Sequence, residues 1–212
     1  MSPQFRLPCL YPIIDRGLAG SLSYAAIVDA LIRGGATFIQ LRAKKLSDRD
    51  LMMETKTALA AALRGKARLI VNDRVDVAAL TGAAGVHLGH EDLPVGEARA
   101  LLGPDAIIGC STHSVEDAVA AGSLPVDYIA LGPIFATRHA SVAREPLGLE
   151  AVAAAAAALS VPLVAIGGID LERAPQVLAA GAASVAVIGD LMSCLDIPAR
   201  TASYLALSSS RT

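Results

Sequence analysis

Two aspartates, Asp73 and Asp92, each follow a short apolar run that is typical of a buried strand. These runs are Arg68–Val71 and Gly85–Leu88, and a helical segment near Val75–Leu80 separates them. Parallel strands joined by a helix point the same way, so their carboxyl ends open onto one edge of the sheet. Mg²⁺ in enzymes often takes one or two carboxylates together with substrate phosphates. The pattern therefore predicts a metal and phosphate site at Asp73 and Asp92.

A second interpretation of the same two aspartates is purely structural. Each aspartate stands just before a helical pattern, and aspartate is a preferred residue at the N-cap of a helix. The stretch from Leu69 to Asp92 supports the two interpretations about equally. Residues elsewhere in the chain must decide between them.

Short apolar runs alternate with helical patterns along the whole chain, which indicates parallel strands joined by helices. The predicted strands are Leu10–Ile14, Thr37–Leu41, Arg68–Val71, Gly85–Leu88, Ala106–Cys110, Val126–Leu131, Val161–Ile166 and Ser184–Ile188. The main predicted helices are Leu22–Arg33, a helix capped by Ser47 that ends near Arg64, Val75–Leu80, Leu93–Leu102, Val115–Ala121, an alanine-rich helix ending near Leu159, Leu171–Ala180 and Leu191–Leu207.

Eight strand–helix units in 212 residues fit a single α/β domain of the (β/α)8 TIM-barrel class. We expect this domain to span residues 1–212, with frayed ends at about 1–8 and 208–212. An open doubly wound sheet is the main competing fold, but its GxGxxG fingerprint does not follow the first predicted strand.

The composition argues against several classes of protein. The net charge of −2 gives no basis for binding nucleic acid or a membrane surface. Three widely spaced cysteines form neither a disulfide framework nor a zinc pattern, and with no signal peptide we expect a cytoplasmic protein. The apolar stretch Ala151–Ile169 has the length of a membrane span, but Ser160, Pro162 and two glycines interrupt it. A helix followed by a buried strand explains that stretch better.

Individual histidines and cysteines give weaker signals. His87 lies inside a predicted strand and Cys110 ends another, so we expect both to belong to the core. His90 and His113 follow strands and could bind either a substrate or the backbone. No HExxH motif or Cys/His cluster is present in the sequence, which argues against zinc.

Glycines after the last two predicted strands form the first group suited to an anion. Backbone N–H groups of Gly167, Gly168 and Gly189 can approach a phosphate closely because no side chain intervenes. The alternative is that these glycines only permit tight turns with positive φ. We favour a monophosphate site.

Basic residues after the second predicted strand form the other group. Arg42 and Lys44 would lie on the same edge as Asp73 and Asp92, and cations beside a carboxylate-bound metal suit a diphosphate. Outside a barrel these charges would simply be a solvated surface group. Two anion sites on one edge predict a two-substrate reaction in which diphosphate is displaced.

Several long motifs make the chain resemble the thiamin phosphate synthase family. They are QLRAK at Gln40–Lys44, VNDRVDVA at Val71–Ala78, GVHLGHEDLP at Gly85–Pro94, IIGCSTHS at Ile107–Ser114, DYIALGPIFAT at Asp127–Thr137 and VAIGGI at Val164–Ile169. The resemblance implies a (β/α)8 barrel that joins an aminopyrimidine methyl diphosphate to a thiazole phosphate. The diphosphate leaves with Mg²⁺, and the thiazole nitrogen captures the resulting pyrimidine cation.

The resemblance also implies roles for individual residues. Asp73 and Asp92 would hold Mg²⁺. The residues expected to bind the pyrimidine diphosphate are Gln40, Arg42, Lys44, Asn72 and Ser111. Among these, Arg42, Lys44 and Ser111 are the expected catalytic residues. The residues expected to bind the thiazole phosphate are Thr137, His139, Gly168, Ile188 and Gly189. The implied partners are small molecules, together with a possible homo-oligomer.

This chain departs from the family pattern at three positions. Ala43 stands where the family usually has glutamate, and Gly189 stands where it often has serine. Ala140 replaces a lysine that would contact the diphosphate, and loss of one such charged contact costs roughly 1.5–3 kcal/mol. We hypothesise that Arg138 or Arg144 in the same loop supplies the missing charge.

Two alternative functions follow from these departures. The related thiazole tautomerases share the barrel but lack the metal carboxylates, and they use a histidine where this chain has Pro133. A non-catalytic barrel that only binds thiazole phosphate would not need Asp73 or Asp92. The presence of both aspartates favours the synthase.

Overall fold

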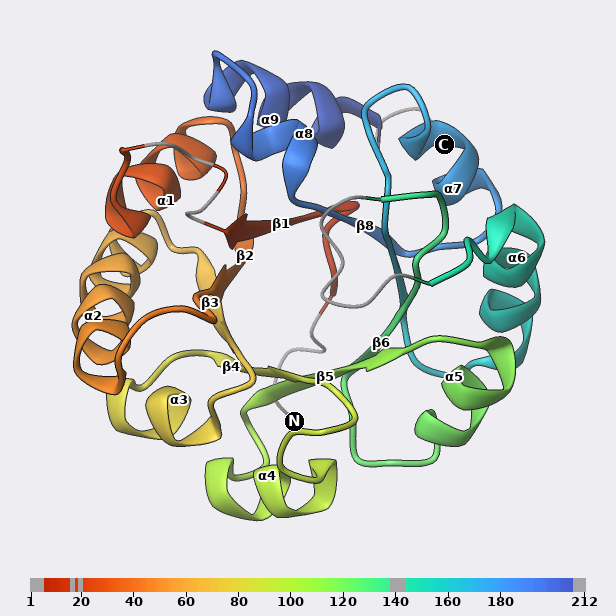
Figure 1. Cartoon of the computed structure of the whole chain (residues 1–212), viewed down its shortest axis with the longest axis horizontal. Coiled ribbons are helices and arrows are strands. Elements are labelled where there is room, and N and C mark those ends of the chain that lie inside the picture. The colour runs from red at the N-terminus through yellow and green to blue at the C-terminus, as the bar shows by residue number, and fades with distance from the viewer. Residues whose placement is uncertain (1–5, 16–17, 19–20, 138–143, 208–212) are drawn as a thin grey trace.

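The expected barrel is present in the computed structural model, which describes residues 6–15, 18, 21–137 and 144–207. Eight parallel strands pair in chain order and the last pairs with the first, so the sheet closes (Figure 1). The strands are β1 (Leu10–Asp15), β2 (Phe38–Arg42), β3 (Arg68–Asn72), β4 (Gly85–Leu88), β5 (Ile107–Thr112), β6 (Tyr128–Leu131), β7 (Leu163–Ile166) and β8 (Ser184–Val187). The chain is therefore a (β/α)8 TIM barrel. Of the predicted frayed ends, residues 1–5 and 208–212 lie outside the described residues.

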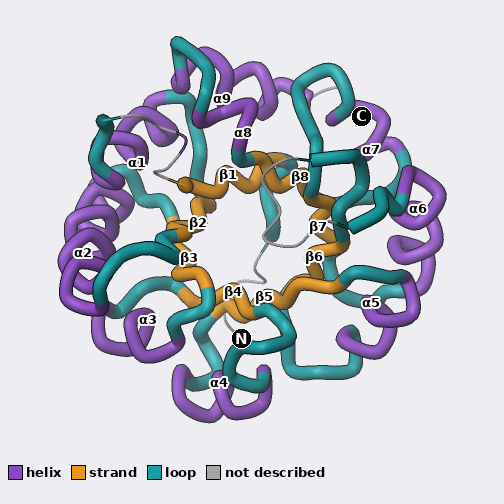
Figure 2. The backbone as a smooth tube through the Cα atoms, viewed as in Figure 1, coloured by secondary structure: helices purple, strands orange, loops and turns teal. Residues whose placement is uncertain are grey.

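Helices surround the ring of strands (Figure 2). They are α1 (Tyr24–Arg33), α2 (Asp48–Arg64), α3 (Val75–Thr81), α4 (Val95–Leu102), α5 (Val115–Ala121), α6 (Gly148–Ala158), α7 (Ala174–Ala179), α8 (Gly189–Met192) and α9 (Ile197–Ala206). The predicted Ser47 cap is confirmed, because its hydroxyl accepts from the Asp50 N–H and α2 begins at the next residue. Within the described part of the chain, no helix has both the length and the apolar character that a membrane crossing needs.

The prediction of one helix over Leu191–Leu207 is wrong, because two helices, α8 and α9, occupy this stretch. The Asp196 carboxylate accepts from the Ala199 N–H and so starts a new helix. Pro198 lies in the first turn of that helix, where its missing N–H costs nothing. Further inside a continuous helix, the same proline would remove a hydrogen bond and clash with the preceding turn.

Alternation of side chains along each strand divides the core into two layers. Odd and even residues of a strand point to opposite faces of the sheet. On β2, Ile39 and Leu41 belong to the large outer cluster between the strands and the helices, whereas Phe38 belongs to the inner cluster. The inner cluster fills the barrel toward the amino ends of the strands, so the barrel is a packed core and not a pore.

Three aromatic rings dominate the inner cluster. Tyr11 lies 4.5 Å from Phe38 and 5.7 Å from Tyr128, measured between ring centroids. Tyr128 meets Tyr11 edge-on, at 87° between the ring planes, which is a favourable aromatic geometry. Gly109 on β5 makes room for Tyr128, since a Cβ atom at Gly109 would lie 2.0 Å from the Tyr128 ring.

We predict that Gly109→Ala lowers the free energy of unfolding by about 2 kcal/mol or more, because the added methyl group must displace the buried Tyr128 ring. Urea unfolding followed by circular dichroism measures the change. Gly96→Ala is the matched control: Gly96 is an exposed residue of α4 with no atom within 4 Å of an added Cβ, and alanine there should stabilise by about 0.5–1 kcal/mol. Equal midpoints for the two variants would contradict the packing argument.

Candidate active site

Side chains alternate between the two faces of each strand, and this alternation also points polar side chains into the barrel at the carboxyl ends of the strands. Gln40 and Arg42 continue the inward positions of β2 beyond Phe38, and Ser111 continues those of β5 beyond Gly109. Asn72 at the end of β3 pairs in register with His87 on β4. Residues that are far apart in the sequence therefore converge on one opening, as the closed parallel sheet requires.

Asp73 and Asp92 come together at this opening. Asp73 follows β3 with a φ of 64°, a left-handed conformation that aspartate tolerates better than most residues. Asp92 Oδ2 accepts from the Gly89 N–H at 2.6 Å, which closes the loop after β4. Burial raises the pKa of Asp92; the Gly89 N–H opposes this shift, and the neighbouring Asp73 carboxyl group adds to it.

The interpretation of these aspartates as helix N-caps is wrong. The N-cap residues of α3 and α4 are Arg74 and Pro94, and neither helix has a side-chain cap hydrogen bond. The two carboxylates instead face one another at the strand ends. No larger cluster of three or more His, Cys, Asp or Glu side chains that could hold a metal occurs among the described residues. A metal here would need further ligands from a substrate or from water.

Basic side chains flank the aspartates. Lys44 Nζ lies 3.3 Å from Asp73 Oδ2. Arg42 forms an ion pair with Asp15 at the end of β1, with 2.5 Å between Nη1 and Oδ2, and the Tyr24 hydroxyl donates to the Arg42 carbonyl oxygen. These contacts hold Arg42 at the strand ends and place Lys44 beside Asp73. Asp15 was not anticipated, although it ends a predicted strand just as Asp73 does.

A cavity of about 400 Å³ contains this charged group. Its lining includes every residue that the sequence predicts for the metal or for the pyrimidine diphosphate: Gln40, Arg42, Lys44, Asn72, Asp73, Asp92 and Ser111. Arg144 also lines this cavity. We call it the charged cavity.

Three histidines also line the charged cavity. His90 Nε2 lies 2.9 Å from Asp117 Oδ2, and His113 Nδ1 lies 2.8 Å from the Gly132 carbonyl oxygen. His87 is buried, as expected for a core residue, and burial lowers its pKa to about 4. It nevertheless reaches the cavity floor, where Nε2 lies 2.9 Å from Ser111 Oγ.

A second cavity of about 420 Å³ opens above β7 and β8. The residues lining it include Thr137, Gly168, Ile188 and Gly189, which are the described members of the predicted thiazole phosphate set. We call it the glycine cavity. The remaining member, His139, and also Arg138 lie outside the described residues.

Gly168 needs to be glycine both for its conformation and for its surroundings. Its φ is +62°, and an added Cβ would lie 2.5 Å from the Ala136 carbonyl oxygen. The Gly168 carbonyl accepts from Arg173 Nη1 at 2.8 Å, and the Arg173 guanidinium lies 5.0 Å from the centroid of the Phe135 ring. The loop at Gly168 is therefore bound by Arg173 on one side and packs closely against Ala136 on the other.

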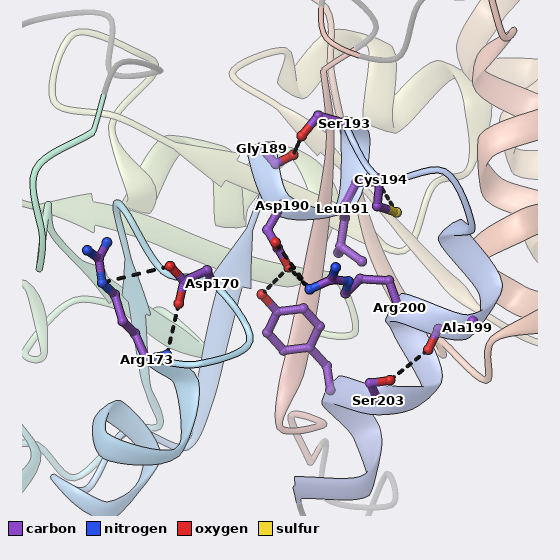
Figure 3. Close-up of polar contacts among 11 residues, drawn as sticks. Asp170, Arg173, Gly189, Asp190, Leu191, Ser193, Cys194, Ala199, Arg200 and Ser203 are labelled. Atoms are coloured by element: carbon purple, nitrogen blue, oxygen red, sulfur yellow. Dashed lines mark hydrogen bonds and ion pairs between the residues drawn. The ribbon is translucent and has the colours of Figure 1, made fainter.

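Asp190, which lines the glycine cavity, makes polar contacts with α9 (Figure 3). Asp190 in α8 accepts from the Tyr204 hydroxyl at 2.8 Å, and Arg200 of α9 lies 3.4 Å from the same carboxylate. Burial and the Asp190 carboxylate raise the pKa of Tyr204. Asp190 is not among the residues predicted from the sequence, although it directly follows Gly189, which is predicted to bind the thiazole phosphate.

The two cavities share a wall. Ile166 at the end of β7 and Ile188 after β8 line both of them. A ligand in the charged cavity and a ligand in the glycine cavity would therefore meet over the same two apolar side chains. This arrangement suits a reaction that joins two substrates.

Comparison with known proteins decides the family. A sequence profile described as thiamine monophosphate synthase matches residues 10–191. The chain belongs to this family. It is 42% identical to the thiamine-phosphate synthase of Albidiferax ferrireducens over 88% of this chain and 85% of that protein. It is 45% identical to the thiamine-phosphate synthase of Anaeromyxobacter dehalogenans over 93% of this chain and 86% of that protein.

A solved structure also supports the membership of the thiamine monophosphate synthase family. The thiamine phosphate pyrophosphorylase from Pyrococcus furiosus is 34% identical to this chain, covers 95% of both chains, and superposes with a TM-score of 0.85. At this identity and coverage, the relationship extends over the whole barrel and includes the rim that carries both cavities.

Cys110 is predicted to be chemically inert in the folded protein. It is buried, and burial together with Asp117 raises the pKa of its thiol to about 11, so the reactive thiolate is scarce at pH 8. Iodoacetamide at pH 8 should modify the partly exposed Cys194 first and Cys110 only after unfolding in urea, as mass spectrometry of peptides would show. Modification of both cysteines at the same rate in the native protein would contradict this.

Proposed function

We propose that this chain is a thiamine-phosphate synthase, a transferase of thiamine biosynthesis. It joins the aminopyrimidine methyl group of a diphosphate substrate to a thiazole phosphate, giving thiamin phosphate and diphosphate. The observation that carries the proposal is the shared wall of Ile166 and Ile188 between a charged cavity and a glycine-lined cavity. Family membership supports the same reaction.

Mg²⁺ is the proposed metal, held by Asp73 and Asp92. Their carboxylates are hard oxygen ligands, and two carboxylates with substrate phosphates suit Mg²⁺ better than a dedicated protein cage would. Burial raises the pKa of Asp92 and the neighbouring Asp73 carboxyl group adds to the shift, and a bound cation would relieve this like-charge contact. When bound, the ion would neutralise negative charge on the diphosphate as it leaves.

The charged cavity is the proposed site for the pyrimidine diphosphate. Arg42 and Lys44 would bind the diphosphate oxygens and stabilise their growing charge during bond breaking. Gln40, Asn72 and Ser111 would hold the pyrimidine ring by hydrogen bonds. The ion pair of Arg42 with Asp15 supports this role, because it fixes the guanidinium at the strand ends.

The glycine cavity is the proposed site for the thiazole phosphate. Backbone N–H groups at Gly168 and Gly189 would bind the phosphate, assisted by Thr137 and His139. Ile188 would pack against the thiazole ring. In the reaction, the bond between the pyrimidine methylene carbon and the diphosphate oxygen breaks, and the thiazole nitrogen forms a new bond to that carbon. No proton needs to move, so the residues act by binding, orientation and charge stabilisation.

The two alternative functions fit the site less well. A thiazole tautomerase needs a histidine at the position of Pro133, which in this chain lines the glycine cavity. A non-catalytic binder of thiazole phosphate has no use for the facing carboxylates of Asp73 and Asp92 or for the cations beside them.

We predict that Asp73→Asn lowers turnover by at least about 100-fold, the usual effect of removing a group that manages transition-state charge. Formation of thiamin phosphate from both substrates with saturating Mg²⁺ measures turnover. Mg²⁺ should also raise the melting temperature of the wild type more than that of the variant. Asp76→Asn is the matched control, because Asp76 is an exposed residue three positions away that pairs with Arg74. Turnover by Asp73→Asn within about threefold of the wild type would favour a binding protein.

We also predict that Arg144→Ala raises the KM for the pyrimidine diphosphate by about tenfold, through loss of one charged hydrogen bond of about 1.5 kcal/mol. Arg144 lines the charged cavity and would replace the lysine that this chain lacks at Ala140. Arg64→Ala is the control, since Arg64 pairs with Asp29 on the outer helices. If neither Arg144→Ala nor Arg138→Ala changes this KM, the compensation hypothesis is wrong.

A further inference from the structure

A chain of hydrogen bonds crosses the inside of the barrel beneath the charged cavity. Gln40 Nε2 donates to the Tyr11 hydroxyl at 2.9 Å, and the hydroxyls of Tyr11 and Tyr128 lie 2.8 Å apart. Tyr128 continues to His87 Nδ1 at 3.0 Å, and His87 Nε2 lies 2.9 Å from Ser111 Oγ. Both ends of the chain, Gln40 and Ser111, line the charged cavity.

The first bond fixes the direction of every other bond. The Gln40 amide N–H can only donate, so the Tyr11 oxygen accepts and its single proton goes to Tyr128. Tyr128 then accepts and gives its own proton to His87 Nδ1. A neutral imidazole has one N–H, which is therefore on Nε2 and donates to Ser111.

Burial makes all the bonds run in one common direction. Tyr11 and Tyr128 are both 1% exposed or less, and burial raises the pKa of each hydroxyl, so both keep their protons. Among the described residues, the buried side-chain atoms without a partner are Thr55 Oγ1 and Ser184 Oγ, and neither belongs to this chain of bonds. Turning one group around would leave two buried donors or two buried acceptors facing each other.

The order also fixes what each end presents to the cavity. Gln40 uses its nitrogen on Tyr11, so its carbonyl oxygen remains as an acceptor for a ligand. Ser111 accepts from His87, so its hydroxyl proton remains as a donor for a ligand. An aminopyrimidine has the complementary pattern, an amino N–H that donates beside a ring nitrogen that accepts. The 4-oxo analogue has the reverse, a carbonyl that accepts beside a ring N–H that donates.

We propose that Tyr11, Tyr128 and His87 are positioning residues that hold Gln40 as an acceptor and Ser111 as a donor, and so select a 4-aminopyrimidine diphosphate over its 4-oxo analogue. This inference rests on the proposed function of the charged cavity. Selectivity arises because the 4-oxo ring would place an acceptor against the Gln40 acceptor and a donor against the Ser111 donor. Buried polar groups left unpaired in this way are an effective basis for rejecting a substrate.

Tyr128→Phe tests the proposal, because it removes the acceptor for the Tyr11 proton and leaves the ring. Tyr11 can then donate only if the Gln40 amide turns over and presents its nitrogen to the cavity. We expect kcat/KM for the 4-amino substrate to fall about 10- to 100-fold and the preference over the 4-oxo analogue to fall as well. The KM for thiazole phosphate should not change, because Tyr128 does not line the glycine cavity.

A double mutant separates positioning from general destabilisation. Tyr11 bonds directly to Gln40, whereas Tyr128 also acts on Ser111 through His87. If Tyr11 acts through Gln40, the double variant Tyr11→Phe with Gln40→Met should be no slower than Gln40→Met alone, within about threefold. Thr112→Val is the matched control, because Thr112 is a buried residue of β5 whose hydroxyl donates to the Ala130 carbonyl outside this chain of bonds. It should leave both kcat/KM and the preference unchanged.

Three results would overturn the proposal: kcat/KM for Tyr128→Phe within about threefold of the wild type, losses that multiply in the double variant, or an equal effect of Thr112→Val. If Tyr128→Phe does not fold, nitrogen-15 NMR of the wild-type histidines provides an independent test. His87, assigned by its absence in His87→Gln, should carry its proton on Nε2, and a proton on Nδ1 would overturn the order. A wild type that makes no thiamin phosphate would instead refute the proposed function, and the NMR result would still test the hydrogen-bond order.

Discussion

Closure of the parallel sheet is the constraint on which the site depends. All eight strands run in the same direction around the barrel, so their carboxyl ends form one circle. Residues 52 positions apart, such as Gln40 and Asp92, then line one cavity. An unfolded chain would not hold Asp73 and Asp92 together, whereas in the fold each is held by its strand and by the loop that follows it. The free energy of packing the barrel therefore holds the two carboxylates together, although like charges repel each other.

The barrel also separates two kinds of binding. The charged cavity has carboxylates and cations fixed by ion pairs, such as Arg42 with Asp15. The glycine cavity is lined mainly by glycines and apolar side chains, and the Arg173 guanidinium donates to the Gly168 carbonyl oxygen in the loop beside it. Beneath the charged cavity, the aromatic cluster around Tyr128 provides a rigid floor. Groups that are held rigidly in this way need little rearrangement when a substrate binds or reacts.

The sequence was sufficient to predict the fold because strand and helix periods alternate without interruption. Seven residues of the charged cavity were also predictable, since each stands near the end of a predicted strand: Gln40, Arg42, Lys44, Asn72, Asp73, Asp92 and Ser111. Asp15 could have been found by the same rule. The boundary between α8 and α9 was missed because apolar residues continue through it, and only Asp196 and Pro198 mark the break.

Other features could not be predicted because they depend on three-dimensional contacts. Tyr11 and Tyr128 lie 117 residues apart, and nothing in either strand indicates that their hydroxyls meet. The sequence predicts His87 to be a core residue and its burial is confirmed, but its contact with Ser111 also connects the core to the cavity. The shared wall of Ile166 and Ile188 depends on where the ends of β7 and β8 place these two side chains, which the apolar pattern does not specify.

A crystal structure of the protein with Mg²⁺, the pyrimidine diphosphate and an unreactive thiazole phosphate analogue would test the shared site most directly. We expect electron density for the metal between the carboxylates of Asp73 and Asp92, with diphosphate oxygens completing its coordination. We also expect the pyrimidine methylene carbon and the thiazole ring to meet over Ile166 and Ile188. A metal bound elsewhere, or two ligands separated by the barrel wall, would contradict this arrangement.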